Sequence, residues 1–249
     1  MNQDGIFRRR HLPHWDVEAA LKELDRCHRA GHRGVLLAAN YEKIGVPNIA
    51  EDVWEPLLKE AEERGLSVNF HIGFNQLSPA DIARLWGGRT RSSMEIAPPD
   101  VLATIRVQAT SFLGNAQAIV DIIVNGVCER YPRLQFVSVE SGFGYVPFVL
   151  QALDWQWNND GGSRANPKLS LLPSEYFERQ ISATFWFEQP PTEWLVRYQD
   201  RLMFETDFPH PTSLTPGPWS SAKPVRETAH RALRDVAPSR RATPRGAPE

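Results

Sequence analysis

Helix-like and strand-like segments alternate along the chain. Apolar residues recur every three or four positions over residues 16–30 and 52–64, and a glycine follows each segment. This spacing predicts two amphipathic helices that end at those glycines. A third helical stretch is expected from residue 98 to 131, with a break at Gly114-Asn115. Two further helices are expected over residues 146–157 and 174–180.

Short apolar runs lie between these helices and are predicted to be strands. They cover residues 34–39, 66–72, 134–140, 181–187 and 202–207. Strands that alternate with helices of ten or more residues, as they do here, are typical of βα units. Such units build parallel sheets, so the sequence indicates an α/β protein.

Polar residues occupy alternate positions in several of the predicted strands. In one strand Asn69 and His71 share a face, and in the next Ser138 and Glu140 are expected to share the polar face. A sheet covered by helices on both sides would have more uniformly apolar strands. A barrel carries its polar groups toward the carboxyl ends of its strands. We therefore predict a distorted TIM (β/α)8-type barrel.

The barrel is expected to be incomplete. A barrel of this type needs eight strands and typically about 250 residues, and the sequence has fewer convincing strands than that. Residues 2–13 are charged and lack alternation, and residues 8–11 could at most end a strand. We expect a single partial barrel domain over residues 1–222, without its first strands. Residues 223–249, rich in Arg, Pro and Ala, are expected to form a loosely ordered tail.

Composition excludes several classes of protein. The chain has 28 basic and 30 acidic residues, a formal net charge of -2, so neither nucleic acid nor an anionic membrane is expected as its main partner. No apolar run is long enough to cross a bilayer, and the first residues lack the apolar region of a signal peptide. Cys27 and Cys128 are interpreted as core residues of a cytoplasmic protein, with a disulfide between them as the alternative.

Three ionisable residues stand at the carboxyl ends of predicted strands: His71, Glu140 and Asp207. In a barrel these ends meet at one mouth. An imidazole with carboxylates is a ligand set that suits Zn²⁺ or Mn²⁺. A metal held there would lower the pKa of bound water and polarise a carbonyl or carboxylate oxygen. The sequence therefore predicts a metal centre at the barrel mouth.

Each of these residues also has a structural interpretation, which the sequence leaves open. His71 could be a hydrogen-bonding residue at a strand end, Glu140 could cap the next helix, and Asp207 could stabilise its turn. His210, between two prolines, either orients Asp207 or the substrate or is a surface turn residue. Trp186 either lines an apolar pocket or belongs to the core.

Four segments together resemble the amidohydrolase-related family. The segments are NFHIG (69–73), FVSVESGFGYVPFVLQALDW (136–155), LPSEYFERQISATFWFE (172–188) and FETDFPHPTSLTPG (204–217). They occur in the family's order, and the resemblance covers residues 15–224. This branch of the metal-dependent amidohydrolase superfamily includes aminocarboxymuconate-semialdehyde decarboxylase and resorcylate-type decarboxylases.

The resemblance implies a distorted TIM barrel with one catalytic divalent metal, zinc first and manganese as the alternative. The metal-binding histidine of the family falls on His71, and its last-strand aspartate, a ligand or general base, falls on Asp207. Where many members have a catalytic histidine, this chain has Glu140, which can act as ligand, acid or base. We assign His210, Trp186 and Asn69 to support the metal ligands or contact the substrate.

The expected function is that of a metal-dependent hydrolase or non-oxidative decarboxylase acting on a small carboxylated or cyclic organic molecule. The sequence does not choose between the two reactions. The alternative is a catalytically impaired barrel fragment, because the family's first-strand metal pair has no counterpart here. Exposed sheet edges in a partial barrel would favour a homo-oligomer.

Overall fold

The computed structural model describes residues 9–38, 45–72, 88–89, 96–97 and 101–206. Its strands are β1 (Arg9–His11), β2 (Gly34–Leu37), β3 (Ser67–His71), β4 (Gly88–Arg89), β5 (Ile96–Ala97), β6 (Phe136–Val139), β7 (Ile181–Phe185) and β8 (Leu202–Phe204). Its helices are α1 (Val17–Arg29), α2 (Glu55–Glu63), α4 (Val101–Ser111), α5 (Gly114–Val124), α6 (Val127–Arg130), α7 (Val146–Asn159), α8 (Gly162–Ala165), α9 (Pro173–Gln180) and α10 (Thr192–Arg197), with a 3-10 turn, η2 (Asp52–Trp54), before α2.

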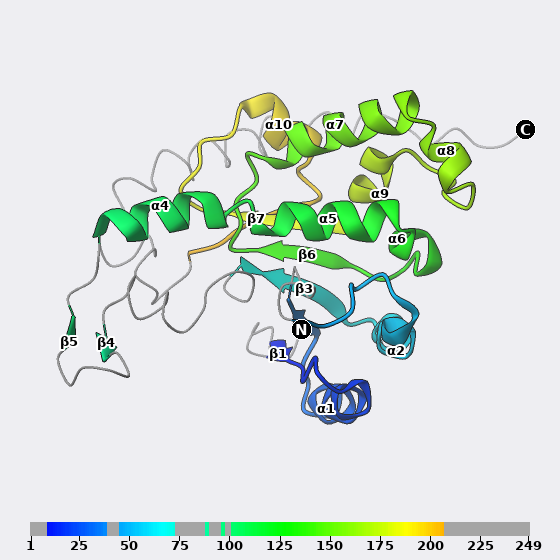
Figure 1. The fold of residues 1–249 in the computed structure, drawn as a ribbon, viewed down its shortest axis with the longest axis vertical. Helices are drawn as coiled ribbons and strands as arrows, with labels where there is room; N and C mark the ends of the chain where they lie inside the picture. Colours follow the sequence, from blue (N-terminus) through cyan, green and yellow to red (C-terminus); the bar gives the residue numbers. More distant parts are fainter. Residues whose placement is uncertain (1–8, 39–44, 73–87, 90–95, 98–100, 207–249) are drawn as a thin grey trace, which may run out of the picture.

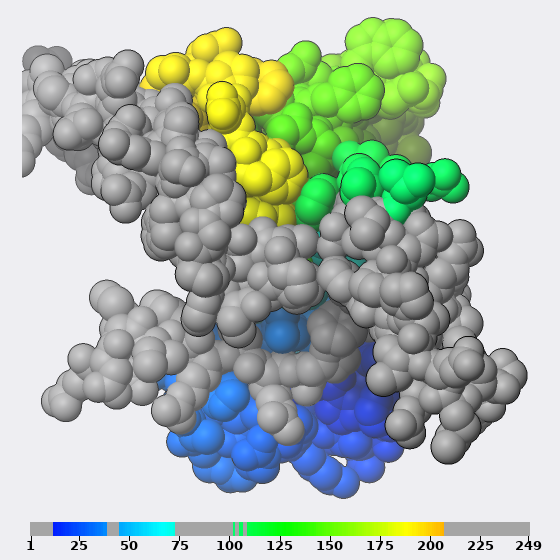
Figure 2. Space-filling model, turned by 90° about the vertical axis from the view of Figure 1, so that its left-hand side faces the viewer, coloured from blue at the N-terminus to red at the C-terminus, as the bar shows by residue number. Residues whose placement is uncertain are grey.

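In the described part of the chain the main sheet has six strands in the order β1-β2-β3-β6-β7-β8, and every neighbouring pair is parallel. Figure 1 shows α5 lying along β6, with α7 on the outer side of α5 and α1 near β1. Because the strands are parallel, their carboxyl ends meet at one edge of the sheet, the edge toward which the β3 and β6 arrows point in Figure 1. Figure 2 views the molecule from that side. The antiparallel pair β4-β5 forms a separate small sheet.

The predicted elements are confirmed with shifted ends. Asp16 caps α1, because its side chain accepts the Ala19 N–H at 3.0 Å. The expected break at Gly114-Asn115 falls where α5 begins. At the start of the chain, the structure places a three-residue strand at Arg9–His11, within the residues expected at most to end one. The short pair β4-β5, the helix α8 and the helix α10 carried no periodic signal and were not predicted.

The main core lies between the sheet and its helices. Phe70 and Phe136 stack at its centre, with ring centroids 6.1 Å apart and planes nearly parallel. Both rings are buried, and α5 packs against the strands that carry them. The helices contribute mainly aliphatic side chains to the same core, among them Ala20, Leu24, Leu57, Leu58, Ile119, Ile122 and Ile123.

Cys27 and Cys128 are both buried and are not joined to each other by a disulfide, as predicted for core residues. Burial raises the pKa of the Cys128 thiol to about 12, so this thiol stays neutral and unreactive in the folded protein. None of the helices in the described part of the chain combines the length and the hydropathy that crossing a membrane requires.

Candidate active site

The strand register decides which side chains share a face of the sheet. His71 pairs with Val139, and Phe70 pairs with Ser138, so His71 and Ser138 lie on opposite faces. The Ser138 hydroxyl accepts a hydrogen bond from Asn115 of α5, at 3.1 Å, and therefore faces the helices. The prediction that the polar residues of β6 line the barrel interior is wrong for Ser138, which belongs to the helix-covered face.

Glu140 does not follow the alternation of side chains along β6, because its backbone is in a left-handed conformation. It has φ of 56°, the left-handed region that a residue with a side chain rarely adopts. Its carboxylate meets the imidazole on the end of β3: Oε2 of Glu140 lies 2.7 Å from Nε2 of His71. The Glu140 side chain is 10% exposed and the His71 side chain 30% exposed, so the pair is sheltered but reachable from solvent. Two of the three predicted site residues are thus brought together at the carboxyl edge.

Asp207 and His210 lie outside the described residues. Among the described residues, no group of three or more His, Cys, Asp and Glu side chains is arranged to hold a metal ion. The donors that do converge, one imidazole nitrogen and one carboxylate oxygen, are of the chemical type that Zn²⁺ and Mn²⁺ bind. Their fit to a divalent metal therefore rests on the His71-Glu140 pair, with a further donor required.

Asn69 lies two residues before His71 and is fully buried. Its Nδ2 donates to the carbonyl oxygens of Val35, at 2.9 Å, and Ser67, at 3.0 Å. Its Oδ1 is buried and has no hydrogen-bond partner among the residues that the structure describes. A buried acceptor without a donor costs free energy unless a ligand or water reaches it. Because Asn69 and His71 are two positions apart in β3, this oxygen without a partner lies on the same face of the strand as His71.

Asn115 fixes the strand ends that carry the pair. Its Nδ2 donates to the carbonyl oxygens of Phe70, at 2.9 Å, and Val139, at 3.2 Å. These are the residues immediately before His71 and Glu140. Asn115 is fully buried, so the amide ties the start of α5 to both strands. From the sequence, Gly114-Asn115 indicates only a helix break, because an asparagine in that position gives no sign of what its side chain binds.

A buried hydroxyl network continues beneath Glu140. The Tyr145 hydroxyl lies 3.1 Å from the Ser138 hydroxyl and 3.3 Å from the Ser141 hydroxyl, within hydrogen-bonding distance of both. Ser141 also donates to the carbonyl oxygen of Phe112. Burial raises the pKa of Tyr145, while its bonds to the two serines lower it, and burial has the larger effect. The network holds the residues around Glu140 from the helix side.

An aromatic cluster adjoins this network. Trp186, just after β7, is buried and packs edge-on against Phe112, with ring centroids 5.3 Å apart. Phe187 contacts both rings and is 47% exposed. The cluster is separate from the main core. Phe112 links Trp186 to the turn after Glu140, because its ring packs on Trp186 and its carbonyl oxygen accepts a hydrogen bond from Ser141. The burial of Trp186 agrees both with a residue that lines a pocket and with a core residue.

Glu188, which no sequence motif identified as a site residue, binds the turn after Glu140. Its carboxylate accepts the backbone N–H of Phe143, at 2.8 Å, and of Gly144, at 2.7 Å. Burial raises the pKa of this carboxyl above its ordinary value of 4.5, and the two backbone donors oppose the shift. The signal available in the sequence was a single acidic residue just past an apolar strand, which is too common to interpret.

The raised pKa of Glu188 predicts a pH dependence of stability. The folded chain binds this proton more tightly than the unfolded chain, so the contribution of Glu188 is fully present below the unfolded pKa and is lost as pH rises through the folded pKa. The neutral variant Glu188→Gln lacks this loss. We expect its melting temperature to rise relative to wild type as the pH rises from below to above the ordinary carboxyl pKa of 4.5. Thermal melts of both proteins across this range check it, and a constant or falling difference would contradict it.

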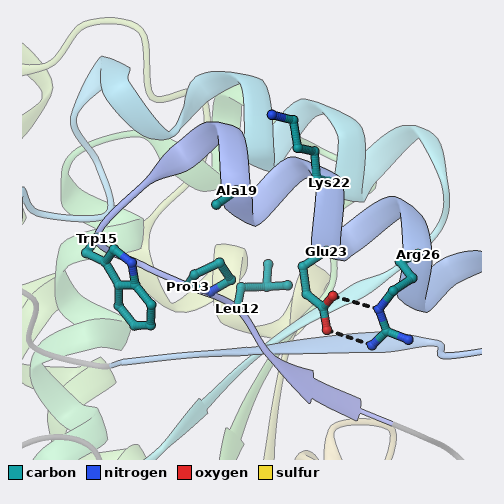
Figure 3. A pocket seen from close by; sticks show the side chains of 7 residues that line it. All are labelled: Leu12, Pro13, Trp15, Ala19, Lys22, Glu23 and Arg26. Atoms are coloured by element: carbon teal, nitrogen blue, oxygen red, sulfur yellow. Dashed lines mark hydrogen bonds and ion pairs between the residues drawn. The ribbon is translucent and has the colours of Figure 1, made fainter.

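A separate hollow of about 550 Å³ lies beside α1 (Figure 3). Trp15, Leu12 and Pro13 form its apolar wall, and an ion pair between Glu23 and Arg26, with 2.7 Å between nitrogen and oxygen, stands at its rim. It follows the end of β1 and does not include His71 or Glu140. It is therefore not the candidate active site.

Comparisons with known proteins place this geometry in a family. The family profile described as amidohydrolase matches residues 2–236. No curated protein shows significant sequence similarity to the chain.

Solved structures of similar fold include an amidohydrolase from Mycobacterium avium subsp. paratuberculosis, with 20% identity, a TM-score of 0.62 and coverage of 92% of this chain and 53% of that one. A 5-carboxyvanillate decarboxylase from Sphingomonas paucimobilis has 21% identity and a TM-score of 0.60, with coverage of 93% and 64%. A dihydroxybenzoic acid decarboxylase from Polaromonas, with bound manganese and the inhibitor 2-nitroresorcinol, has 17% identity and a TM-score of 0.51, with coverage of 90% and 67%.

The described sheet therefore corresponds to part of a larger fold. The chain spans 53% and 64% of the length of the first two of these proteins. The predicted fold class is confirmed: the parallel strands and their helices form part of an amidohydrolase-type barrel. Since the family profile matches nearly the whole chain, the protein belongs to the amidohydrolase family.

Proposed function

We propose that this protein is a metal-dependent enzyme that removes a carboxylate group, without oxidation, from a small carboxylated aromatic molecule. The observation that carries the proposal is the convergence of His71 and Glu140, 2.7 Å apart, at the carboxyl edge of the parallel sheet. Membership of the amidohydrolase family supports metal-dependent chemistry at this edge. The names of two structural neighbours, both decarboxylases of aromatic acids, favour decarboxylation over hydrolysis.

In the proposed site His71 and Asp207 hold one divalent metal, and Glu140 assists either as a further ligand or as the acid. Zinc was the metal expected from the resemblance, and the neighbour with bound manganese makes Mn²⁺ an equal candidate. When bound, the metal would neutralise the substrate's carboxylate and an adjacent oxygen. Asn69 supports the proposal because its orphaned Oδ1 faces the same side as His71 and can accept a hydrogen bond from a ligand or water.

Loss of CO₂ leaves an electron pair on the ring carbon, which must take up a proton. A carboxylic acid beside the substrate can deliver it, and the proposed donor is whichever of Glu140 and Asp207 is not bound to the metal. Trp186 and Phe187 are proposed to border the aromatic ring of the substrate, because their cluster adjoins the turn that follows Glu140. His210 is proposed to orient Asp207. The whole reaction consumes one proton and needs no oxidant.

The test combines metal analysis with a decarboxylation assay. The purified full chain is expected to bind Zn²⁺ or Mn²⁺ in equimolar amount and to release CO₂ from 2,6-dihydroxybenzoate or 5-carboxyvanillate. Removal of the metal with a chelator is expected to abolish CO₂ release and to lower the melting temperature, since a ligand that binds only the folded state stabilises it. A chain that binds no metal, and whose melting temperature does not respond to chelator, would instead be the impaired barrel fragment.

A further inference from the structure

The turn between β6 and α7 has an unusual backbone. Glu140 has φ of 56° and Gly142 has φ of 70°, so two left-handed residues stand within three positions. Glutamate is disfavoured in this region by roughly 1–2 kcal/mol. Such a conformation persists only when the surrounding structure holds it in place. The contacts that hold this turn therefore also decide where the Glu140 carboxylate points.

The far end of the turn is held by Glu188. Both carboxylate oxygens lie near the Phe143 N–H, at 3.0 and 2.8 Å, and one of them also accepts the Gly144 N–H at 2.7 Å. A Cβ atom at position 142 would lie 2.7 Å from a Glu188 oxygen. Gly142 is thus required both for its positive φ and for the close approach of this carboxylate. Within the part of the chain that the structure describes, Glu188 is the acceptor for both of these N–H groups.

The near end of the turn is held by Thr184. Its Oγ1 accepts the Glu140 N–H at 3.0 Å and donates to Oε1 of Glu205 at 2.7 Å. Thr184 lies in β7, and Glu188 follows the same strand. The segment from Thr184 to Glu188 therefore binds the turn at both ends: Thr184 binds the N–H of Glu140, and Glu188 binds the N–H groups that follow Gly142.

We propose that Glu188 is a positioning residue for Glu140. By binding the Phe143 and Gly144 amides it keeps the turn in the one conformation that brings the Glu140 carboxylate to His71. Glu188 binds the turn at these two backbone N–H groups, so it acts on the Glu140 side chain through the backbone. The inference rests on the proposed function in one respect: the His71-Glu140 pair is taken as part of the metal site.

The test measures the affinity of the full chain for Zn²⁺ by chelator competition, together with hydrogen exchange of the segment that contains the Phe143 and Gly144 amides. Glu188→Ala is expected to weaken Zn²⁺ binding by about 10- to 100-fold, as for other residues that orient ligands, and to speed exchange of this segment. Glu188→Gln keeps one acceptor oxygen, so its affinity and exchange are expected to lie between those of Glu188→Ala and wild type.

Glu175→Ala serves as the matched control. Glu175 is also a carboxylate that accepts a backbone N–H, that of Leu172 at 2.7 Å, but it caps α9. Its loss is expected to lower thermal stability without changing Zn²⁺ affinity. If wild type binds Zn²⁺ and Glu188→Ala binds it as tightly, the inference is wrong; if wild type itself binds no Zn²⁺, the proposed function is wrong. Should Glu188→Ala fail to fold, Glu188→Gln decides, because wild-type affinity and exchange in that variant would overturn the inference.

Discussion

Replacing His71 with alanine is expected to abolish metal binding and to lower kcat/KM for decarboxylation by at least about 10³-fold. The imidazole is one of the two donors that meet at the carboxyl edge, and its removal leaves the Glu140 carboxylate without that partner. A metal stabilises developing charge by several kcal/mol, and about 4 kcal/mol corresponds to a factor of roughly 10³ in rate. Elemental analysis of the purified variant and the CO₂-release assay measure the two effects.

The matched control is His32→Ala. His32 lies two residues before β2, at the amino edge of the sheet and away from the candidate site. It should retain the metal content and the activity of wild type. Equal metal content in His71→Ala and wild type would exclude His71 as a ligand, whatever the activity of the variant.

Replacing Phe136 with alanine is expected to lower the free energy of unfolding by about 3–5 kcal/mol. The ring is fully buried at the centre of the sheet and stacks on Phe70, with centroids 6.1 Å apart. Its removal loses the transfer free energy of the ring and leaves a cavity that the neighbouring strands cannot close. Since many domains are stable by only 5–15 kcal/mol, this change removes a large share of the total. Urea denaturation of the variant and of wild type measures the difference.

Phe148→Ala is the control for this prediction. Phe148 lies on α7 and is 74% exposed, so its loss should change the free energy of unfolding by no more than about 0.5 kcal/mol. A Phe136→Ala variant as stable as Phe148→Ala would mean that the β3-β6 interface is not the centre of the core.

The strand ends were predictable because parallel βα units leave a regular pattern. Apolar runs located the main strands, and His71 and Glu140 were identified because each closes such a run. That the two side chains meet was a prediction of the barrel, and the structure shows them 2.7 Å apart. Their roles as metal ligand and acid or base stay predictions.

The faces of β6 were less predictable. Alternation assigned Ser138 and Glu140 to one side, but Ser138 binds Asn115 on the helix side, and a positive φ turns Glu140 toward His71. The hydrogen bonds of Asn115 to two strands and the left-handed backbone of Glu140 do not alter the hydrophobic periodicity of the sequence, so they could not be predicted from it. Glu188 escaped for a similar reason, since its partners are backbone amides 44 and 45 positions away.

The left-handed backbone of Glu140 sets stability against chemistry at a single position. Glycine or asparagine would adopt the same conformation with less strain, so a search for more robust variants would converge on them there. Every such gain would delete the carboxyl group that meets the imidazole. Selection for heat resistance alone would therefore inactivate the proposed enzyme at position 140 while leaving its fold intact.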